Sequence, residues 1–243
     1  MFKDIRIPKN IDSPILEAIF EIRYAPSCPG EALYGLLIDD VFSKFPNNEN
    51  HTLPILEIPP QIRNIDPNLK FQPYYRASKD GFAFAIGPHS IVFSALRPYL
   101  GWTEWTDFFS PILETIKKKN IIHSVERIGL RTLDLFNGNI LDKINANLTI
   151  ADKAISTSPT SFFTEFEQDD VRVLLNIGNA ANVNGQPTKD SLMDIDCIRW
   201  FNCEANVFFS TYKEVLEKAH SANKQVFFGL MNQELLTSLN PEY

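Results

Sequence analysis

Two long amphipathic helices are the feature that most constrains how this chain folds. Apolar residues recur three and four positions apart from Trp102 to Lys119 and again from Val207 to Met231. Each helix follows a series of short segments in which apolar and polar residues alternate. Because such alternation is typical of half-buried strands, the pattern predicts antiparallel sheets whose faces the two helices cover.

The predicted elements fall into two groups that meet near residue 121. The first group has a strand at Ser13–Tyr24, an amphipathic helix at Leu33–Phe45, and only short strands within Thr52–Arg97, at Tyr74–Ala77, Phe82–Ile86 and Ile91–Leu96. The second has a strand at Ser124–Phe136, a short helix at Asn139–Ile144, strands at Thr160–Gln168, Val171–Ile177 and Leu192–Trp200, and a terminal helical turn at Leu235–Leu239. The polar segment Gly178–Asp190 is expected to be a functional or mobile loop.

Both groups follow one plan, in which a strand and a helix precede antiparallel strands and a long helix. The sequence therefore predicts an α+β fold with two similar halves, residues 1–121 and 122–243, each an antiparallel sheet covered by a long helix. The halves could also form one continuous unit. In element order this saddle or helix-grip arrangement is similar to the TATA-box-binding protein fold, although a shared fold does not assign a function.

Charge and cysteine content exclude several classes of protein. Thirty acidic and 23 basic side chains give a net charge of −7, whereas bulk electrostatic binding of nucleic acid needs a basic face. Cys28, Cys197 and Cys203 are too scattered for a disulfide framework or a metal motif, which favours a reducing, cytoplasmic setting. The first ten residues lack a signal-peptide pattern, and no apolar run approaches the ~18 residues of a membrane span, so no membrane partner is expected.

Charged side chains gather on one face of two predicted strands. They are Glu17, Glu21 and Arg23 on the first strand and Arg127 and Arg131 on Ser124–Phe136. If the strands are neighbours, these groups can form cross-strand ion pairs that join the two halves. Alternatively, the two arginines flank Gly129 as a clamp for a phosphate or carboxylate, or the surface contacts a protein partner.

Asp194 and Asp196 lie two residues apart on a predicted strand and would project from one face, about 7 Å apart. Such a pair can bind a divalent cation or divide acid and base roles, but a solvated strand face is the alternative. His220 could join them if the last helix crosses that strand, or it is a histidine packed at the edge of the core. The remaining histidines, His51, His89 and His123, have no acidic or nucleophilic partner nearby in the sequence.

Aromatic residues are concentrated around the start of the mid-chain helix. Those inside the helix, such as Trp105, Phe108 and Phe109, are expected to be core, whereas Tyr99 and Trp102 would stay partly exposed as an interface anchor. The chain contains no GxGxxG, GxxxxGK[ST], HExxH or GxSxG motif. The sequence therefore predicts no cofactor and does not favour an enzyme.

Several segments together resemble a divergent, sporadically distributed family of bacterial and archaeal proteins of about this length. They are Pro14–Ala18 with Glu21–Tyr24, Tyr99 with Trp102, Val125–Arg131, and Asp194–Asp196 followed by His220 and Phe227. The Arg-Ile-Gly-Leu-Arg segment is the most specific match. Thr132-Leu133-Asp134 departs from the aromatic residue, isoleucine and asparagine of the family pattern. The resemblance implies no activity, and the family's patchy distribution looks like that of genes in mobile or defence islands.

These observations lead to two hypotheses about function. The first is a non-enzymatic binding protein, a partner, sensor or antitoxin-like component of a bacterial defence or toxin–antitoxin operon. Its partner would be a protein encoded nearby, or a second copy in a homo-oligomer. The alternative is an enzyme or ligand-binding protein that acts on a phosphorylated small molecule or nucleotide through Arg127, Arg131, Asp194, Asp196 and His220.

Overall fold

The largest element of the fold is an antiparallel sheet of eight strands in the order β2-β3-β4-β1-β5-β12-β9-β8. The computed structural model describes residues 2, 5–45, 52–63, 65–147, 149–156, 159–183 and 186–243. Strands β1 (Ile15–Pro26) and β5 (Ile122–Phe136) are hydrogen-bonded neighbours in this sheet. The predicted α+β class is confirmed. Within the described ranges, every helix is too short or too polar to cross a membrane.

The chain divides into two compact units that interleave in sequence. One comprises Met1–Ala18, Leu130–Ile198 and Glu217–Tyr243, and the other Ile19–Gly129 and Arg199–Leu216. This division differs from the expected boundary at residue 121, because β1, β5, β12 and α5 each contribute residues to both units.

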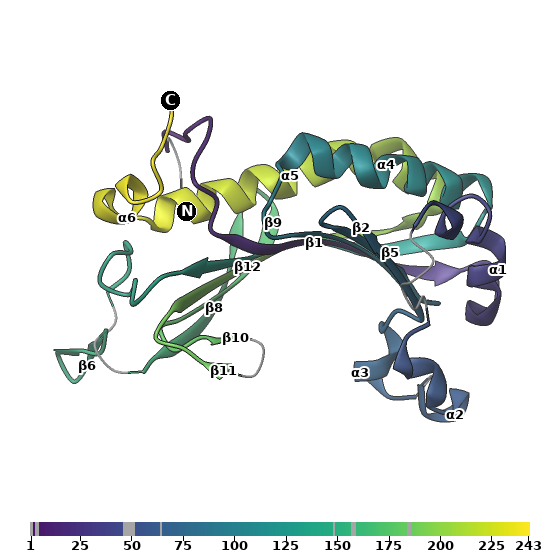
Figure 1. Cartoon of the computed structure of the whole chain (residues 1–243), viewed down its shortest axis with the longest axis horizontal. Helices are drawn as coiled ribbons and strands as arrows, with labels where there is room; N and C mark the ends of the chain where they lie inside the picture. Colours follow the sequence, from purple (N-terminus) through teal and green to yellow (C-terminus); the bar gives the residue numbers. More distant parts are fainter. Residues whose placement is uncertain are drawn as a thin grey trace. The chain divides into compact units, whose positions relative to one another are not determined.

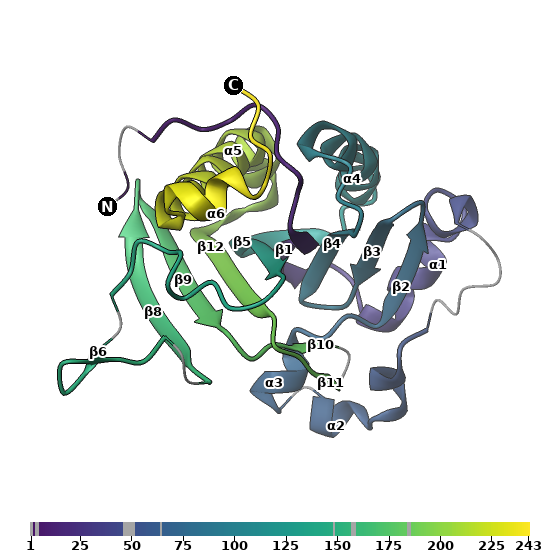
Figure 2. The same ribbon diagram turned by 60° about the vertical axis from the view of Figure 1, so that its left-hand side comes forward.

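The unit that contains Ile19–Gly129 includes a three-strand meander with a helix on one face (Figure 2). Its elements are β2 (Tyr75–Lys79), β3 (Phe82–Ile86), β4 (Ser90–Leu96) and α4 (Trp102–Lys118). The β2–β3 turn is built by Asp80 and Gly81, whose φ angles of 53° and 81° suit a tight hairpin. Phe109 of α4 packs against Phe20 and Phe93, with ring centroids 5.2 and 5.4 Å away. These contacts confirm the predicted strands and helix.

The other unit places the C-terminal part of α5 and α6 on one face of β9 and β12 (Figure 2). Its elements include β8 (Ser161–Gln168), β9 (Val171–Gly178), β12 (Ser191–Glu204), α5 (Ala205–Leu230) and α6 (Gln233–Thr237). Phe227 of α5 stacks on Phe136 of β5, with centroids 6.4 Å apart. Alternate residues of β9, Val171 to Ile177, are buried, as the period-two pattern predicts.

Short elements complete the chain (Figure 1). They are the 3-10 turns η1 (Gly30–Ala32), η2 (Phe42–Lys44) and η3 (Pro54–Glu57), the helices α1 (Leu33–Leu37), α2 (Pro60–Arg63) and α3 (Pro67–Lys70), and the two-residue strands β6 (Thr149–Ile150), β7 (Lys153–Ala154), β10 (Asn182–Val183) and β11 (Gln186–Pro187).

Three local predictions are wrong. The helix predicted for Leu33–Phe45 is interrupted: α1 ends at Leu37, and Val41, with φ −124° and ψ −67°, lies outside the helical region just before η2. Segment 54–70, expected to hold only strands, forms η3, α2 and α3, each of which starts with a proline that suits the first helical turn. Asn139–Ile144 contains a turn at Leu141–Asp142 and no helix. The Leu141 amide donates its hydrogen bond to the Asn139 side chain, whereas in a helix it would donate to a backbone carbonyl one turn earlier.

The polar segment Gly178–Asp190 carries the β10–β11 hairpin, in which Asn182 pairs with Pro187. Asn184 and Gly185 at its tip lie outside the described residues, as does His51. The described part of this segment therefore contains a short hairpin, which the sequence did not predict.

Phe109 tests how much the α4 face contributes to stability. The residue is 1% exposed and sits among aromatic rings, so Phe109→Ala should lower the free energy of unfolding by about 3–5 kcal/mol. Asp107→Ala, on the exposed side of the same helix, should change it by less than about 0.5 kcal/mol. Urea denaturation of both variants measures this difference, and equal effects would contradict the packing described.

Candidate functional site

The carboxylate of Glu21 on β1 joins two arginines. Its Oε2 atom accepts hydrogen bonds from Nη2 of Arg127 on β5 at 2.8 Å and from Nε of Arg23 at 3.0 Å. Arg127 is only 7% exposed, and this carboxylate supplies a counter-charge for its buried guanidinium. Arg23 also stacks over the ring of Phe71, 4.1 Å from the centroid. The predicted cross-strand pairing of β1 and β5 is therefore confirmed at this position.

Arg131 makes the second cross-strand pair, with Asp194 on β12. Its Nε and Nη2 atoms donate to Oδ1 and Oδ2 of Asp194 at 2.7 and 2.6 Å, a forked arrangement. This hydrogen bonding raises the pKa of Arg131, with smaller contributions from the charges of Asp196 and Glu17. Glu17 thus lies near Arg131, although the sequence interpretation did not identify Asp194 as the partner of this arginine.

These pairs determine what the proposed anion clamp can do. The forked donors of Arg131 point at Asp194, and Arg127 points at Glu21. A phosphate would have to compete with a carboxylate at each arginine. Of the three alternatives, the arrangement corresponds most closely to cross-strand ion pairs.

The joint site of Asp194, Asp196 and His220 is not formed. Ile195 and Cys197, which alternate with the aspartates along β12, are fully buried, and Asn223 of α5 donates to the Ile195 carbonyl at 3.3 Å. Helix α5 therefore packs on the face of β12 opposite the two aspartates, because successive strand residues point to opposite faces. No group of three or more His, Cys, Asp or Glu side chains in the described ranges is arranged to hold a metal ion.

His220 lies instead at the edge of the α5 packing. Its Nδ1 atom is 3.6 Å from a carboxylate oxygen of Glu217, one turn earlier. Burial, together with the charge of Lys224, lowers the pKa of His220 to about 4. The imidazole is therefore neutral at pH 7 and is a weak base.

A buried polar cluster lies on the helix-facing side of β5. Asn223 donates to the Thr132 hydroxyl at 3.2 Å, and Asp134, two residues along the strand, is 1% exposed. Burial raises the pKa of Asp134 to about 7, and its Oδ2 atom has no hydrogen-bond partner. The sequence interpretation missed this cluster. The signal was present, because Thr132 and Asp134 alternate in phase with the apolar Ile128 and Leu130.

Tyr99 and Trp102 are half-buried, as expected for an interface anchor. Both pack against Trp105, with ring centroids 6.5 and 5.7 Å away, and burial raises the pKa of Tyr99. Trp102 is the first residue of α4 rather than a residue ahead of it. Leu100, between them, is 50% exposed. The sequence interpretation did not single out Leu100.

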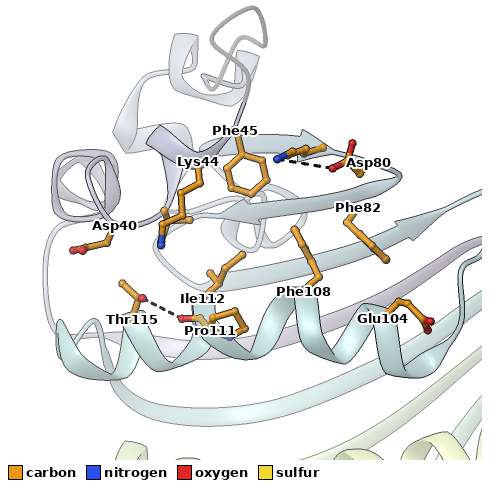
Figure 3. A pocket seen from close by; sticks show the side chains of 12 residues that line it. Asp40, Lys44, Phe45, Asp80, Phe82, Glu104, Phe108, Pro111, Ile112 and Thr115 are labelled. Carbon is orange, nitrogen blue, oxygen red and sulfur yellow. Dashed lines mark hydrogen bonds and ion pairs between the residues drawn. The ribbon is translucent and has the colours of Figure 1, made fainter.

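An aromatic-lined pocket lies along α4 (Figure 3). Phe108, predicted to be core, turns its ring into this cavity of about 350 Å³, where it stacks on Phe82 at 5.0 Å and contacts Phe45 at 6.3 Å. Figure 3 shows Lys44 at one end of the pocket and Glu104 at the other. Among the described residues that line it, none is a cysteine, serine or histidine. We call this cavity the α4 pocket.

A second, more polar cavity of about 560 Å³ is lined by residues that include Lys70, His89, Glu126 and Cys203. Burial lowers the pKa of His89 and raises that of Cys203. Both groups are therefore neutral at pH 7, which is not the thiolate state that a cysteine nucleophile needs. This cavity therefore offers hydrogen bonds and charge to a ligand, and the Cys203 thiol in it is not activated.

The Glu21 cluster should contribute measurably to stability. Glu21→Gln removes the charged partner of the 2.8 Å ion pair with the buried Arg127, so the free energy of unfolding should fall by about 2–4 kcal/mol. Glu234→Gln removes the exposed pair with Lys143 and should lower the free energy of unfolding far less, because solvent screens an exposed ion pair. Denaturant titration of both variants checks the ranking, and a larger loss for Glu234→Gln would contradict it.

Asp134 predicts a pH dependence of stability. An aspartate has a pKa near 3.9 in the unfolded chain, whereas burial raises the pKa of Asp134 to about 7 in the folded protein. The folded state therefore binds the extra proton, so this group stabilises the fold below about pH 4 and the effect is lost as the pH rises to about 7. Denaturation curves measured between pH 4 and 7 should show that Asp134→Asn reduces the fall in the free energy of unfolding with rising pH. Asp107→Asn, on the exposed side of α4, is the control and should leave that fall unchanged. An unchanged slope in Asp134→Asn would refute this assignment.

Comparison with known proteins leaves the site to be interpreted from its geometry. No family model matches the chain, and no curated protein matches it.

Proposed function

We propose that this chain is a non-enzymatic binding protein whose α4 pocket accepts an apolar or aromatic side chain of a partner protein. The observation that carries the proposal is the pocket itself. Phe45, Phe82 and Phe108 surround a cavity large enough for one such side chain, and the rim has charges of both signs. Apolar pockets with a polar rim are typical of the anchor positions of protein interfaces.

The surroundings of the pocket extend this contact surface. Helix α4 also carries the half-buried Trp102, and the exposed Leu100 precedes it by two residues. Exposed aliphatic and half-buried aromatic side chains supply the apolar area that a partner can cover. The surface therefore consists of Leu100, Trp102 and the α4 pocket.

The arrangement of reactive groups supports binding over catalysis. Arg131 and Asp194 neutralise each other, and His220 is a weak base beside Glu217. The alternative function, with an arginine clamp and an aspartate pair acting on a phosphorylated ligand, needs those same groups to be available. The observed pairing gives that alternative less support.

Three broader proposals accompany this one. The strand order reads β2-β3-β4-β1 from one edge and β8-β9-β12-β5 from the other, which supports the saddle-like arrangement in two similar halves. Cys28, Cys197 and Cys203 are free thiols, which supports a reducing, cytoplasmic compartment. Membership of the sporadically distributed family would make the partner the product of a neighbouring gene in a defence or toxin–antitoxin operon.

Phe108→Glu tests the binding proposal by placing a charge inside the α4 pocket. Affinity for the protein encoded by the adjacent gene, measured by calorimetry, should fall at least about 100-fold, since anchor residues contribute 2 kcal/mol or more. Thr103→Glu, on the exposed side of the same helix, is the matched control and should leave affinity unchanged. Equal affinities for the two variants, at an unchanged melting temperature, would refute the pocket as the contact.

A thermal-shift screen with nucleotides and divalent metals separates the alternative function from the proposal. A ligand present at about 100 times its dissociation constant adds about 2.7 kcal/mol of stability. A shift that Arg131→Ala abolishes would support the arginine clamp as a ligand site and would favour the alternative function over the α4 pocket.

A further inference from the structure

Strand β8 is the long, open edge of the eight-stranded sheet. It has eight residues, against five in β2 at the opposite edge. All eight pair with β9 on one side, and within the described residues no strand pairs with the other side. An open strand edge presents backbone N–H and C=O groups to any strand that can align with it.

The side chains of β8 leave much apolar surface uncovered. Phe163 is 64% exposed, and Phe162 and Phe166 are half-buried although they belong to a sheet that is otherwise well packed. In most soluble proteins such edges are short, bulged or blocked by proline. Strand β8 is long and contains no proline or glycine.

We propose that the chain forms a two-fold dimer in which β8 pairs antiparallel with β8 of a second copy. This inference goes beyond the binding function proposed above and does not depend on it. The strand itself argues for a second copy, because Phe162 and Phe166 are placed symmetrically about Thr164. With Thr164 opposite Thr164 of the second copy, residues 161–167 pair throughout, and Phe162 lies opposite Phe166. Aromatic pairs directly opposite each other stabilise antiparallel strands.

Charge selects this register over its neighbours. In the proposed register Glu165 faces Phe163 and Glu167 faces Ser161, so no two carboxylates are opposed. Within its own chain, Glu165 is already paired with Arg172, with N and O atoms 2.7 Å apart. If one β8 strand slid by two residues in one direction, Glu165 would lie opposite Glu165 of the second copy. If it slid by two residues in the other direction, only residues 161–165 of β8 would remain paired. A shift by one would place the two sets of side chains on opposite faces.

A charge-swap experiment tests the dimer on the full-length chain. Thr164 is exposed and lies at the two-fold axis, so Thr164→Lys and Thr164→Glu each place like charges opposite one another. Analytical ultracentrifugation should show the unchanged chain as a dimer. Each variant alone should have a dissociation constant at least about tenfold higher, and an equimolar mixture of the two should recover the dimer. Ser78→Lys on edge strand β2 is the control and should leave dimerisation unchanged.

Cysteine cross-linking tests the register. Directly opposed residues in antiparallel strands have Cα atoms about 4.5–5.5 Å apart, within disulfide range. In a Cys28→Ser, Cys203→Ser background, Thr164→Cys should form a disulfide-linked dimer under mild oxidation. Ser161→Cys should not, because position 161 lies about 20 Å from its counterpart across six paired residues.

Three results would overturn the inference: a monomer at all concentrations, a dimer that persists unchanged in both charge variants, or equal cross-linking at positions 161 and 164. Its failure is distinguishable from failure of the proposed function. Phe108→Glu acts at the α4 pocket and should leave the β8 dimer intact, and the Thr164 variants should leave partner affinity intact.

Discussion

Neutralisation of the charges on strand β5 is the constraint on which the rest of the structure depends. Arg127 is almost fully buried, and its charge is matched by Glu21 on the neighbouring β1. Further along β5, Arg131 is matched by Asp194 of β12. A buried guanidinium without a counter-charge would cost several kcal/mol, so the Glu21–Arg127 pair favours β1 as a neighbour of β5. The Arg131–Asp194 pair, whose arginine is part-exposed, adds a weaker preference for β12 on the other side. The opposite face of β5 carries the buried Asp134, and burial raises the pKa of its carboxyl group to about 7.

The same neutralisation decides where binding can occur. Arginines whose donors are already aligned with carboxylates are poor candidates for capturing a free anion, because the ligand must replace an existing ion pair. The surfaces proposed for contacts are apolar instead: the α4 pocket with Leu100, and the edge of β8 with Phe163. Both favour contacts with protein over a small charged substrate.

Much of the fold was predictable because its signals are local. The alternation in β1, β5, β9 and β12 and the stripes of α4 and α5 specify each element without reference to its neighbours. Errors occurred where a local signal was ambiguous, as at Val41, where three-and-four spacing continues although the backbone leaves the helix. The Glu21–Arg127 pair was predictable once β1 and β5 were taken as neighbours. The pairing of Arg131 with Asp194 was not, because sequence separation carries no information on which strand lies on the other side of β5.

The sequence by itself determined the element types, the buried faces and the candidates for charge pairing, since these follow from the periodicity of single segments. Only the tertiary structure decided the strand order, and with it which carboxylate each arginine binds. It also decided that His220 and Asp194 belong to opposite faces of β12, and that Phe45, Phe82 and Phe108 enclose a pocket. The physical reason is that these features arise between segments far apart in the chain. Their contacts depend on how helices and strands pack, and no spacing within one segment encodes that arrangement.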